Sequence, residues 1–372
     1  MLMRTLHIFN PEHDMALAAD AEVLTPPHTI RRFCSDLAFL PALWADDGDV
    51  VLVDDVAGAV EAARHLARHS AKVRFATVGD VASGMAGDIT SVSPWGWDKA
   101  LVRRLRPAAD FLKGLMPDAA RLSALRAMSH RRFAAESLLA PIVADTVGTV
   151  GESVFCVSFN EARREVSRHA SGAVLKMPWS SSGRGVRYAP VHGMDANMEG
   201  WVENVIARQG GIMVEPRYAN VMDFGMEFNC DPHYGIRYCG LSLFLTDKGA
   251  YKGGLIATEE QKRDLLSRYA DMTLVDEIRQ KIVQTLQPLM SGVYEGPFGV
   301  DMMIVAVADG RGFHVHPCVE LNLRRTMGHV AIALSPSVPQ PWRVMSVESG
   351  DRCKVCVHET TYDMVNTSVA RL

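Results

Sequence analysis

The sequence predicts two structural parts, a parallel α/β domain followed by a larger α+β domain. In the first 120 residues, apolar strand-like runs alternate with amphipathic helical stretches, which is the pattern of a small parallel sheet. From about residue 150, strand-like runs follow one another closely, as in antiparallel sheets. A chain of 372 residues is also too long for one ordinary core. We therefore expect domains over residues 1–120 and 121–340, and a short extension over 341–372.

In the first part, residues 4–9, 49–55 and 72–78 read as strands. Helical stretches are expected over residues 29–45 and 57–69, between these strands. Residues 94–112 supply a turn and another helix. Residues 122–141 are helical again, and we expect Pro141 to end this helix.

In the second part, the strand-like runs are residues 173–179, 186–191, 211–218, 224–231, 234–246, 296–307 and 313–323. Helical patterns occupy residues 198–211, 259–270 and 274–290. One or two further strands are expected in the short tail after Pro339.

Composition excludes several classes of function. The net charge of −4 gives no basic field that would attract nucleic acid or an anionic membrane. The first apolar stretch is too short for a signal-peptide core, and no run has the length of a transmembrane helix. Seven dispersed cysteines indicate reduced thiols and a cytoplasmic location. Cys353 and Cys356 form a lone CxxC, for which a structural role is favoured over a metal or redox role.

The segment GVDMMIVAVADGRGFHVHPCVELNL predicts a hairpin, because Asp-Gly-Arg-Gly is a strong turn signal. A turn centred there places Asp301 opposite Glu320 and diagonal to Asn322 on one face. Opposed like charges are destabilising, whereas two carboxylates and an amide oxygen suit Mg²⁺. In the alternative interpretation, Asp301 lies at a strand end in water and Glu320 pairs with Arg324 or Arg325. A bulge at Pro317 would change the register.

Two further segments have features of a nucleotide site. Lys176 precedes a loop of small residues from Ser180 to Gly185, whose backbone N–H groups can wrap phosphates. Taken singly, such a stretch is an ordinary hairpin loop, and the chain contains neither a Walker A motif nor GxGxxG. A further strand ends in Glu215-Pro216, and proline has no N–H to donate to a neighbouring strand. Backbone groups beside it are therefore free to hydrogen-bond the edge of a planar base.

In order, these features resemble the ATP-grasp superfamily of carboxylate–amine ligases, which includes D-alanine–D-alanine ligase and glutathione synthetase. They are a strand lysine before a Ser/Gly loop, a strand ending in Val-Glu-Pro, Glu-Phe-Asn-Cys, Gly-Val-Asp and Val-Glu-Leu-Asn-Leu-Arg. The resemblance covers roughly residues 121–335 and implies a lid-bearing part over roughly 121–215. The first 120 residues resemble, by layout, the small α/β domain that precedes the grasp.

The resemblance implies roles for individual residues. Lys176 matches the lysine that contacts ATP phosphates, and Arg324 matches an arginine that steadies the transferred phosphate. Glu227 resembles the glutamate that holds the ribose, although its distance along the chain from Glu215 is longer than usual. The lid loop would comprise Ser180, Ser181, Ser182, Gly183 and Gly185; the hinge that meets adenine would comprise Met213, Val214, Glu215, Pro216 and Arg217; and the Mg²⁺ ligands would be Asp301, Glu320 and Asn322.

The implied activity is an ATP-dependent ligation that uses Mg²⁺, expected as two ions, and proceeds through an acyl-phosphate. The expected partners are a small carboxylate and an amine, with no nucleic acid and no membrane, and a homodimer is compatible with the sequence. One alternative is a grasp-fold kinase for small molecules. Another is a nucleotide-binding regulatory protein without turnover, although the intact metal and lysine positions argue against it.

Two clusters are candidate substrate contacts. One follows the first strand and comprises Asn10, His13 and Asp14, together with His28. Helix capping and surface charge explain it equally well. The other is Lys248, Tyr251 and Lys252, in an expected Gly-flanked loop over residues 246–254 that is otherwise simply exposed. PWGWDK is assigned to packing. His314 and His316 are assigned either to structural roles or to support of the metal ligands, because a hard-oxygen site argues against zinc.

Overall fold

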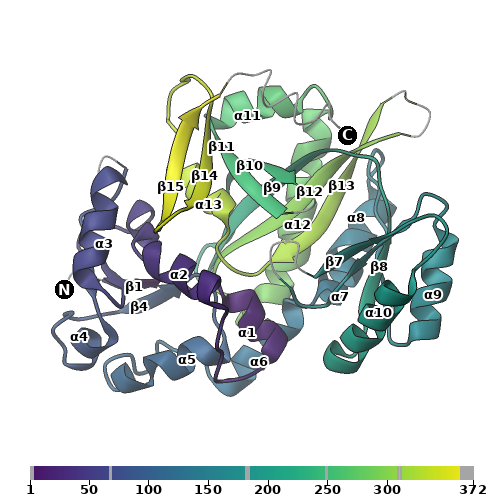
Figure 1. The fold of residues 1–372 in the computed structure, drawn as a ribbon. Helices are drawn as coiled ribbons and strands as arrows, with labels where there is room; N and C mark the ends of the chain where they lie inside the picture. Colours follow the sequence, from purple (N-terminus) through teal and green to yellow (C-terminus); the bar gives the residue numbers. More distant parts are fainter. Residues whose placement is uncertain are drawn as a thin grey trace.

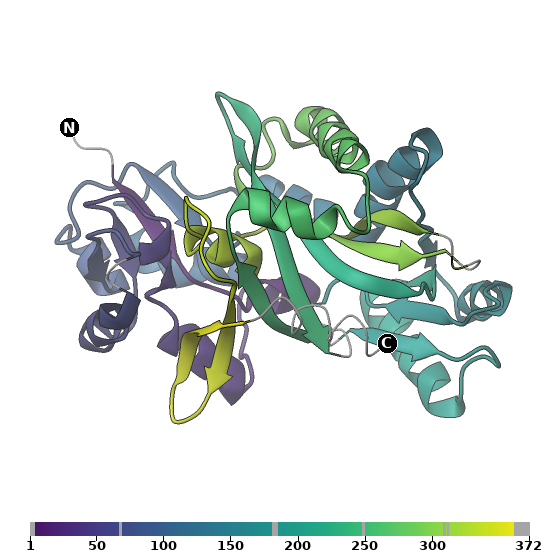
Figure 2. The same cartoon turned by 90° about the horizontal axis from the view of Figure 1, so that it is seen from above.

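The computed structural model describes residues 4–66, 69–180, 185–247, 250–307, 310 and 312–360. Three sheets lie in a row along the molecule, a four-stranded parallel sheet at one end, a seven-stranded antiparallel sheet in the middle and a second four-stranded sheet at the other end (Figures 1 and 2). This is the mixed α/β and α+β architecture that the sequence predicts.

The N-terminal sheet has the strand order β3-β2-β1-β4. Its strands are β1 Thr5–Ile8, β2 Val50–Leu52, β3 Arg74–Ala76 and β4 Ser91–Pro94, and its main helices are α1 His13–Ala19, α2 His28–Asp36, α3 Val56–Ala63, α4 Val78–Ala82 and α5 Lys99–Leu105. Strand β4 escaped the sequence interpretation because Ser and Pro dominate it. The helix expected over residues 29–45 is wrong in extent, since α2 ends at Asp36 and Leu40–Leu43 form a 3₁₀ turn around Pro41.

The helical region that follows consists of α6 Ala119–Met128, α7 Arg131–Ala134, a π-helical turn Ala135–Leu139 and α8 Ala140–Asp145. Our expectation that Pro141 ends the helix is wrong. Pro141 lies in the first turn of α8, directly after the π-helical turn. A proline at the start of a helix gives up an N–H that has no intrahelical acceptor there, so the helix continues.

The sheet at the other end has the order β5-β8-β6-β7 and is antiparallel. Its strands are β5 Val154–Cys156, β6 Ala173–Lys176, β7 Val186–Ala189 and β8 Ile212–Pro216, and it packs with α9 Phe159–Arg168 and α10 Ala196–Gln209.

The central sheet has the order β13-β12-β9-β10-β11-β14-β15. Its strands are β9 Asn220–Asp231, β10 Gly235–Asp247, β11 Ala250–Ile256, β12 Gly296–Ala306, β13 Phe313–Asn322, β14 Arg343–Ser349 and β15 Cys353–Glu359, and the accompanying helices are α11 Glu259–Leu266, α12 Met272–Met290 and α13 Met327–Ala333. The loop expected over residues 246–254 is wrong, because Tyr251 and Lys252 lie within β11. The tail expected to hold one or two strands supplies β14 and β15.

The two faces of the central sheet differ in chemistry. Alternate residues of β9 and β12, such as Phe224, Phe228, Phe298 and Val300, are fully buried in one core with residues of α12. The intervening positions of the same strands therefore point to the opposite face. That opposite face carries the polar residues of the candidate site.

The hairpin β12–β13 confirms the predicted pairing of Asp301 with Glu320, although its register is not uniform. Near the turn, Met303 pairs with His316, and three residues, Pro317 to Val319, then lie opposite the single residue Met302. This irregularity shifts the register by two residues and so keeps Asp301 and Glu320 on the same face. A uniform register from the turn pairs would have placed Asp301 opposite Cys318, whose proline neighbour cannot take its full part in the ladder.

Within the described residues, no helix combines the length and apolar character that crossing a membrane requires.

Candidate active site

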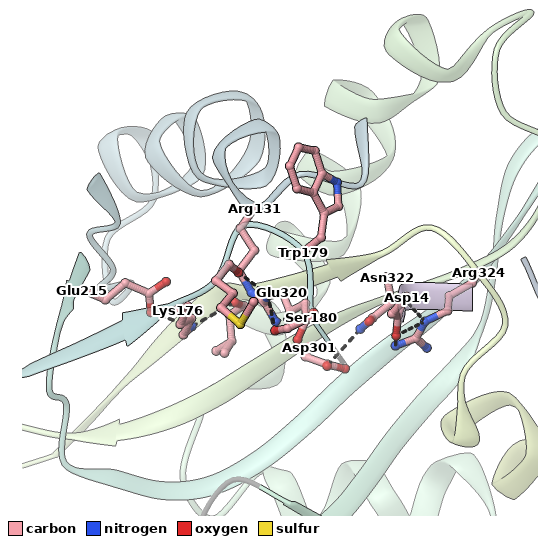
Figure 3. A network of polar contacts seen from close by, with 12 residues as sticks. Asp14, Arg131, Lys176, Trp179, Ser180, Glu215, Asp301, Glu320, Asn322 and Arg324 are labelled. Atoms are coloured by element: carbon pink, nitrogen blue, oxygen red, sulfur yellow. Dashed lines mark hydrogen bonds and ion pairs between the residues drawn. The ribbon is translucent and has the colours of Figure 1, made fainter. Parts of the chain in front are cut away.

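Three side chains from two adjacent strands meet on the polar face of the central sheet. Asp301 on β12 pairs with Glu320 on β13, and the Asn322 Nδ2 donates a hydrogen bond of 3.0 Å to Asp301 Oδ2 (Figure 3). Asn322 is buried, whereas Asp301 and Glu320 retain some exposure. The structure therefore brings together the three predicted metal ligands.

The Asp301 carboxylate lies in an environment that disfavours its charge. Desolvation, with the negative charges of Glu320 and Glu227, raises the pKa of Asp301 to about 8. A divalent cation would relieve this repulsion, and two carboxylates with an amide oxygen are the donor set that Mg²⁺ takes. The Asn322 amide would present its oxygen after rotating about its last torsion. These residues fit a magnesium site.

Arg131 is a site residue that the sequence interpretation missed. Its Nη2 donates to Glu320 Oε1 at 2.7 Å, and its Nη1 donates to Met177 O at 2.7 Å and to Ser180 Oγ at 2.9 Å. One guanidinium thus links α7, the residues after β6 and the expected metal ligand. Residues 129–133 offered no local signal in the sequence, because the contacts of Arg131 are with residues far away along the chain.

Lys176 lies at the end of β6 and forms an ion pair with Glu215 of β8, Nζ to Oε2, at 2.6 Å. It also donates to Val319 O at 3.3 Å, which brings β6 against β13. Both charged side chains are buried, and Ser153 Oγ donates to the other oxygen of Glu215 at 3.0 Å. Among the expected lid-loop residues, Ser180 and Gly185 are described, whereas Ser181, Ser182 and Gly183 lie outside the described residues.

Arg324 is held by the N-terminal domain. It pairs with both oxygens of Asp14, with Nε to Oδ1 and Nη2 to Oδ2 each at 2.8 Å. Burial opposes the charge of this guanidinium, but Asp14 outweighs that effect, and the pKa of Arg324 is raised. The alternative interpretation expected Arg324 or Arg325 to pair with Glu320. In the structure, Arg131 forms that ion pair instead.

Asn10 and His13, which precede Asp14 in the same candidate cluster, are held by Asp98. His13 Nδ1 donates to Asp98 Oδ2 at 3.0 Å, and Asn10 Nδ2 donates to Asp98 Oδ2 at 3.3 Å and to Gly96 O at 2.8 Å. All three side chains are buried. Asp98 also caps α5 by accepting from Leu101 N. The PWGWDK segment therefore both packs and orients the cluster that precedes Asp14.

A small pocket joins these groups. It lies between α1, the turn from α6 to α7, the residues after β6 and the end of β13. Its lining includes His13, Asp14, Arg131, Ser180, Glu320 and Arg324. Trp179 forms part of its wall, with the Arg126 guanidinium stacked 3.7 Å from the centre of its ring. Residues from the first and last hundred positions of the chain therefore share one cavity.

Glu227 lies apart from the hinge strand. It pairs with Gly299 of β12 in the register of the sheet, and its Oε2 is 3.0 Å from His329 Nδ1. It is 2% exposed, and its charge contributes to the raised pKa of Asp301. The ribose contact that the resemblance implied for this residue stays a prediction.

Other candidate residues are not gathered into this pocket. His28 is exposed at the start of α2, and Lys252 is exposed on β11. The Tyr251 hydroxyl is buried on β11, where the ring contacts Phe244. Lys248 lies outside the described residues. Met213 and Val214 are fully buried in β8. His316 is buried as well, and this burial lowers its pKa to about 3.

Comparison with solved structures identifies similar folds. N5-carboxyaminoimidazole synthetase from Staphylococcus aureus, solved with ADP, aligns with a TM-score of 0.51 at 12% identity, over 93% of this chain and 83% of that one. The biotin carboxylase domain of 2-oxoglutarate carboxylase from Hydrogenobacter thermophilus, solved with MgADP, gives 0.49 at 12% identity, over 93% and 75%. An Archaeoglobus fulgidus protein assigned to the ATP-grasp superfamily gives 0.48 at 10% identity, over 96% and 100%. No protein-family profile and no curated sequence matches the chain.

Proposed function

Since the chain has the ATP-grasp fold, we propose that it is an ATP- and Mg²⁺-dependent ligase that joins a carboxylate to an amine. The main support is the convergence of Asp301, Glu320 and Asn322 on one face of the sheet. Cationic side chains from three other segments, Arg131, Lys176 and Arg324, surround this face. Separate elements therefore supply opposite charges to one place, as phosphoryl transfer requires.

Asp301, Glu320 and Asn322 would hold Mg²⁺, which would neutralise charge on the phosphate oxygens of ATP. Arg131 currently neutralises Glu320. With the cation bound, its guanidinium would be free to turn from Glu320 toward the phosphates while staying anchored to Met177 O. Lys176, at the end of β6, would add a second positive charge. We propose two Mg²⁺ ions, as the resemblance implies.

The proposed reaction has two steps. An oxygen of the substrate carboxylate attacks the γ-phosphorus and ADP leaves, which gives an acyl-phosphate. The amine then attacks the acyl carbon, and phosphate leaves. Arg324 would stabilise the transferred phosphoryl group, and the segment around Ser180 would limit the access of water. No protein nucleophile is needed.

The substrates would be small molecules, such as amino acids, peptides or other metabolites, that enter the pocket beside α1. His13 and Asn10 would act there mainly by positioning Asp14, because their own polar atoms are engaged with Asp98 and Gly96. A cytoplasmic location and a homodimer stay predictions of the sequence.

The function is tested by an ATP-to-ADP assay with pools of carboxylic acids and amines, read by mass spectrometry of the products. We expect ADP release to depend on both a carboxylic acid and an amine. ADP formed with a hydroxyl acceptor alone would identify a kinase. Nucleotide binding without turnover in any pool would identify a regulatory protein.

The metal assignment is tested by Asp301→Asn and Glu320→Gln. Each should lower ATP turnover by at least about 100-fold, because the hard-oxygen donor set is broken while the fold is kept. The matched control is Asp264→Asn, an exposed carboxylate on α11. Unchanged turnover in both site variants, with normal circular dichroism, would exclude the metal assignment.

A further inference from the structure

The two cysteines of the lone CxxC, Cys353 and Cys356, lie on opposite faces of the hairpin formed by β14 and β15. Residues three apart on a strand point to opposite faces. Cys353 is buried on the inner face, and its backbone N–H donates to Asp36 Oδ2 at 2.8 Å. Cys356 lies on the outer face and keeps part of its surface exposed. The two thiols therefore do not form a redox pair or a shared metal site.

On the outer face, Cys356 meets two other metal-binding side chains. Cys356 pairs with Ser346 in the register of the hairpin, and Glu348 and His358 lie on either side of this pair. His358 Nε2 is 3.0 Å from Glu348 Oε1. One donor atom each from Glu348, Cys356 and His358 lies within 4.8 Å of the other two. The register of two paired strands fixes the three positions.

This donor set has the chemistry of a zinc site. Zinc takes thiolate, imidazole and carboxylate ligands, and a tetrahedral ion with such bonds holds its donor atoms roughly 3.3–3.8 Å apart. The present separations of at most 4.8 Å lie close to that spacing. The side chains of Glu348 and His358 are more than half exposed, so they have room to adjust. A soft thiolate disfavours Mg²⁺ and Ca²⁺.

We propose that Glu348, Cys356 and His358 bind one divalent cation of the zinc class, with water at the fourth position. On binding, the Cys356 thiol releases its proton to solvent and the sulfur donates a lone pair to the cation. The cation also replaces the direct contact between Glu348 and His358. Lys354, opposite Glu348 on the same face, is the nearest competing charge in the hairpin register.

The site is separate from the candidate active site. Strand β15 lies six strand positions from β13, which at about 4.8 Å per strand is roughly 29 Å across the sheet. The inner face of the hairpin packs through Met345, Cys353 and Val355 into a core that includes Leu37 and Leu40 of the N-terminal domain. Figure 1 shows the hairpin beside α2. A cation bridging the two strands would stiffen the element that connects this domain to the central sheet.

The test is a Co²⁺ titration of the full-length chain without an affinity tag, after removal of metal by a chelator. We expect one equivalent of Co²⁺ to give a thiolate-to-cobalt charge-transfer band, which Zn²⁺ displaces and excess Mg²⁺ does not. Cys356→Ser should abolish the band. His358→Gln should weaken binding at least about tenfold, since even residues that only support a ligand contribute 10–100-fold.

The control is Cys239→Ser, which removes an exposed thiol on β10 and should leave the band unchanged. Zn²⁺ should also raise the melting temperature of the wild-type chain and not of Cys356→Ser. Absence of the band in the wild-type chain, or a band that survives Cys356→Ser, would overturn the proposal. ATP turnover is not a readout, so failure here is independent of the proposed ligase activity.

Discussion

At the scale of one residue, Asp301 is a carboxylate in an environment that disfavours its charge. Its carboxylate lies beside Glu320 and Glu227, and no guanidinium or ammonium group of the described residues forms an ion pair with it. A carboxylate in such a place destabilises the metal-free fold. A bound cation would compensate the negative charge of this cluster. Without the cation, the free energy of unfolding should therefore depend on pH.

Without metal, stability should fall as pH rises from about 4 to about 8. The folded chain keeps the proton of Asp301 up to a pKa of about 8, whereas the unfolded chain releases it near 3.8. The folded state therefore binds more protons in this window, and the free energy of unfolding decreases with pH. Denaturant unfolding at pH 5 and pH 8 with a chelator measures the effect. Asp301→Asn should remove this part of the pH dependence; identical pH profiles for the two chains would contradict the prediction.

Arg131 is a second residue whose substitution should change ATP turnover. Arg131→Ala should lower ATP turnover by about 10–100-fold, because it removes a cation held beside the expected phosphate position. Its neighbour Arg132 is the matched control, since it is exposed and pairs with Glu136 on the same helical surface. Arg132→Ala should leave turnover unchanged. Equal effects of the two substitutions would show that Arg131 has no specific role.

At the scale of the element, the close approach of α13 to β9 depends on one glycine. Thr326 forms a capping box with His329, so α13 starts at a defined residue. His329 then reaches Glu227 of β9, and Gly328 lies between them without a side chain. A Cβ at Gly328 would be only 2.5 Å from Ser242 Oγ and even closer to Glu227. The helix can approach the sheet only because this position is glycine.

Gly328→Ala should destabilise the chain by about 1–3 kcal/mol through this overpacking. Gly200 is the matched control, as a helical glycine in α10 around which a Cβ would meet nothing within 4 Å. Gly200→Ala should stabilise by about 0.5–1 kcal/mol, because alanine favours the helix. Thermal or denaturant unfolding measures both. A stabilising Gly328→Ala would contradict the packing described here.

At the scale of the whole molecule, the ion pair between Asp14 and Arg324 connects the two ends of the chain. Both side chains are 15% exposed, and the pair joins α1 to the segment between β13 and α13. Asp14 thereby holds Arg324, the residue for which we propose a contact with the transferred phosphate. The candidate pocket is thus lined by residues from both ends of the chain.

A double-mutant cycle tests this coupling. For Asp14→Asn and Arg324→Gln, we expect a coupling energy of at least about 1 kcal/mol in the free energy of unfolding, because both partners are largely desolvated. Each single variant should also lower ATP turnover. The exposed pair Arg104 and Asp54 is the control, with an expected coupling below about 0.5 kcal/mol. Equal coupling energies in the two cycles would refute the argument.

Local sequence patterns were enough to predict which side chains share a face of the central sheet. Strand alternation and the turn signal place Asp301 and Glu320 on one face, and the structure has that pairing even though a bulge near Pro317 changes the register toward the turn. The strand that carries Lys176 and the fold class were also predictable, because they depend on local periodicity and on the order of motifs.

The tertiary structure alone decided which charges meet. Arg131 reaches Glu320 across 189 positions, and Asp14 reaches Arg324 across 310. Glu227 lies near Asp301 because β9 pairs with β12, a pairing between strands that are distant in sequence. Local patterns specify which face a side chain occupies, since backbone geometry repeats every two residues in a strand. They do not specify contacts between distant segments, which depend on how helices and sheets pack together.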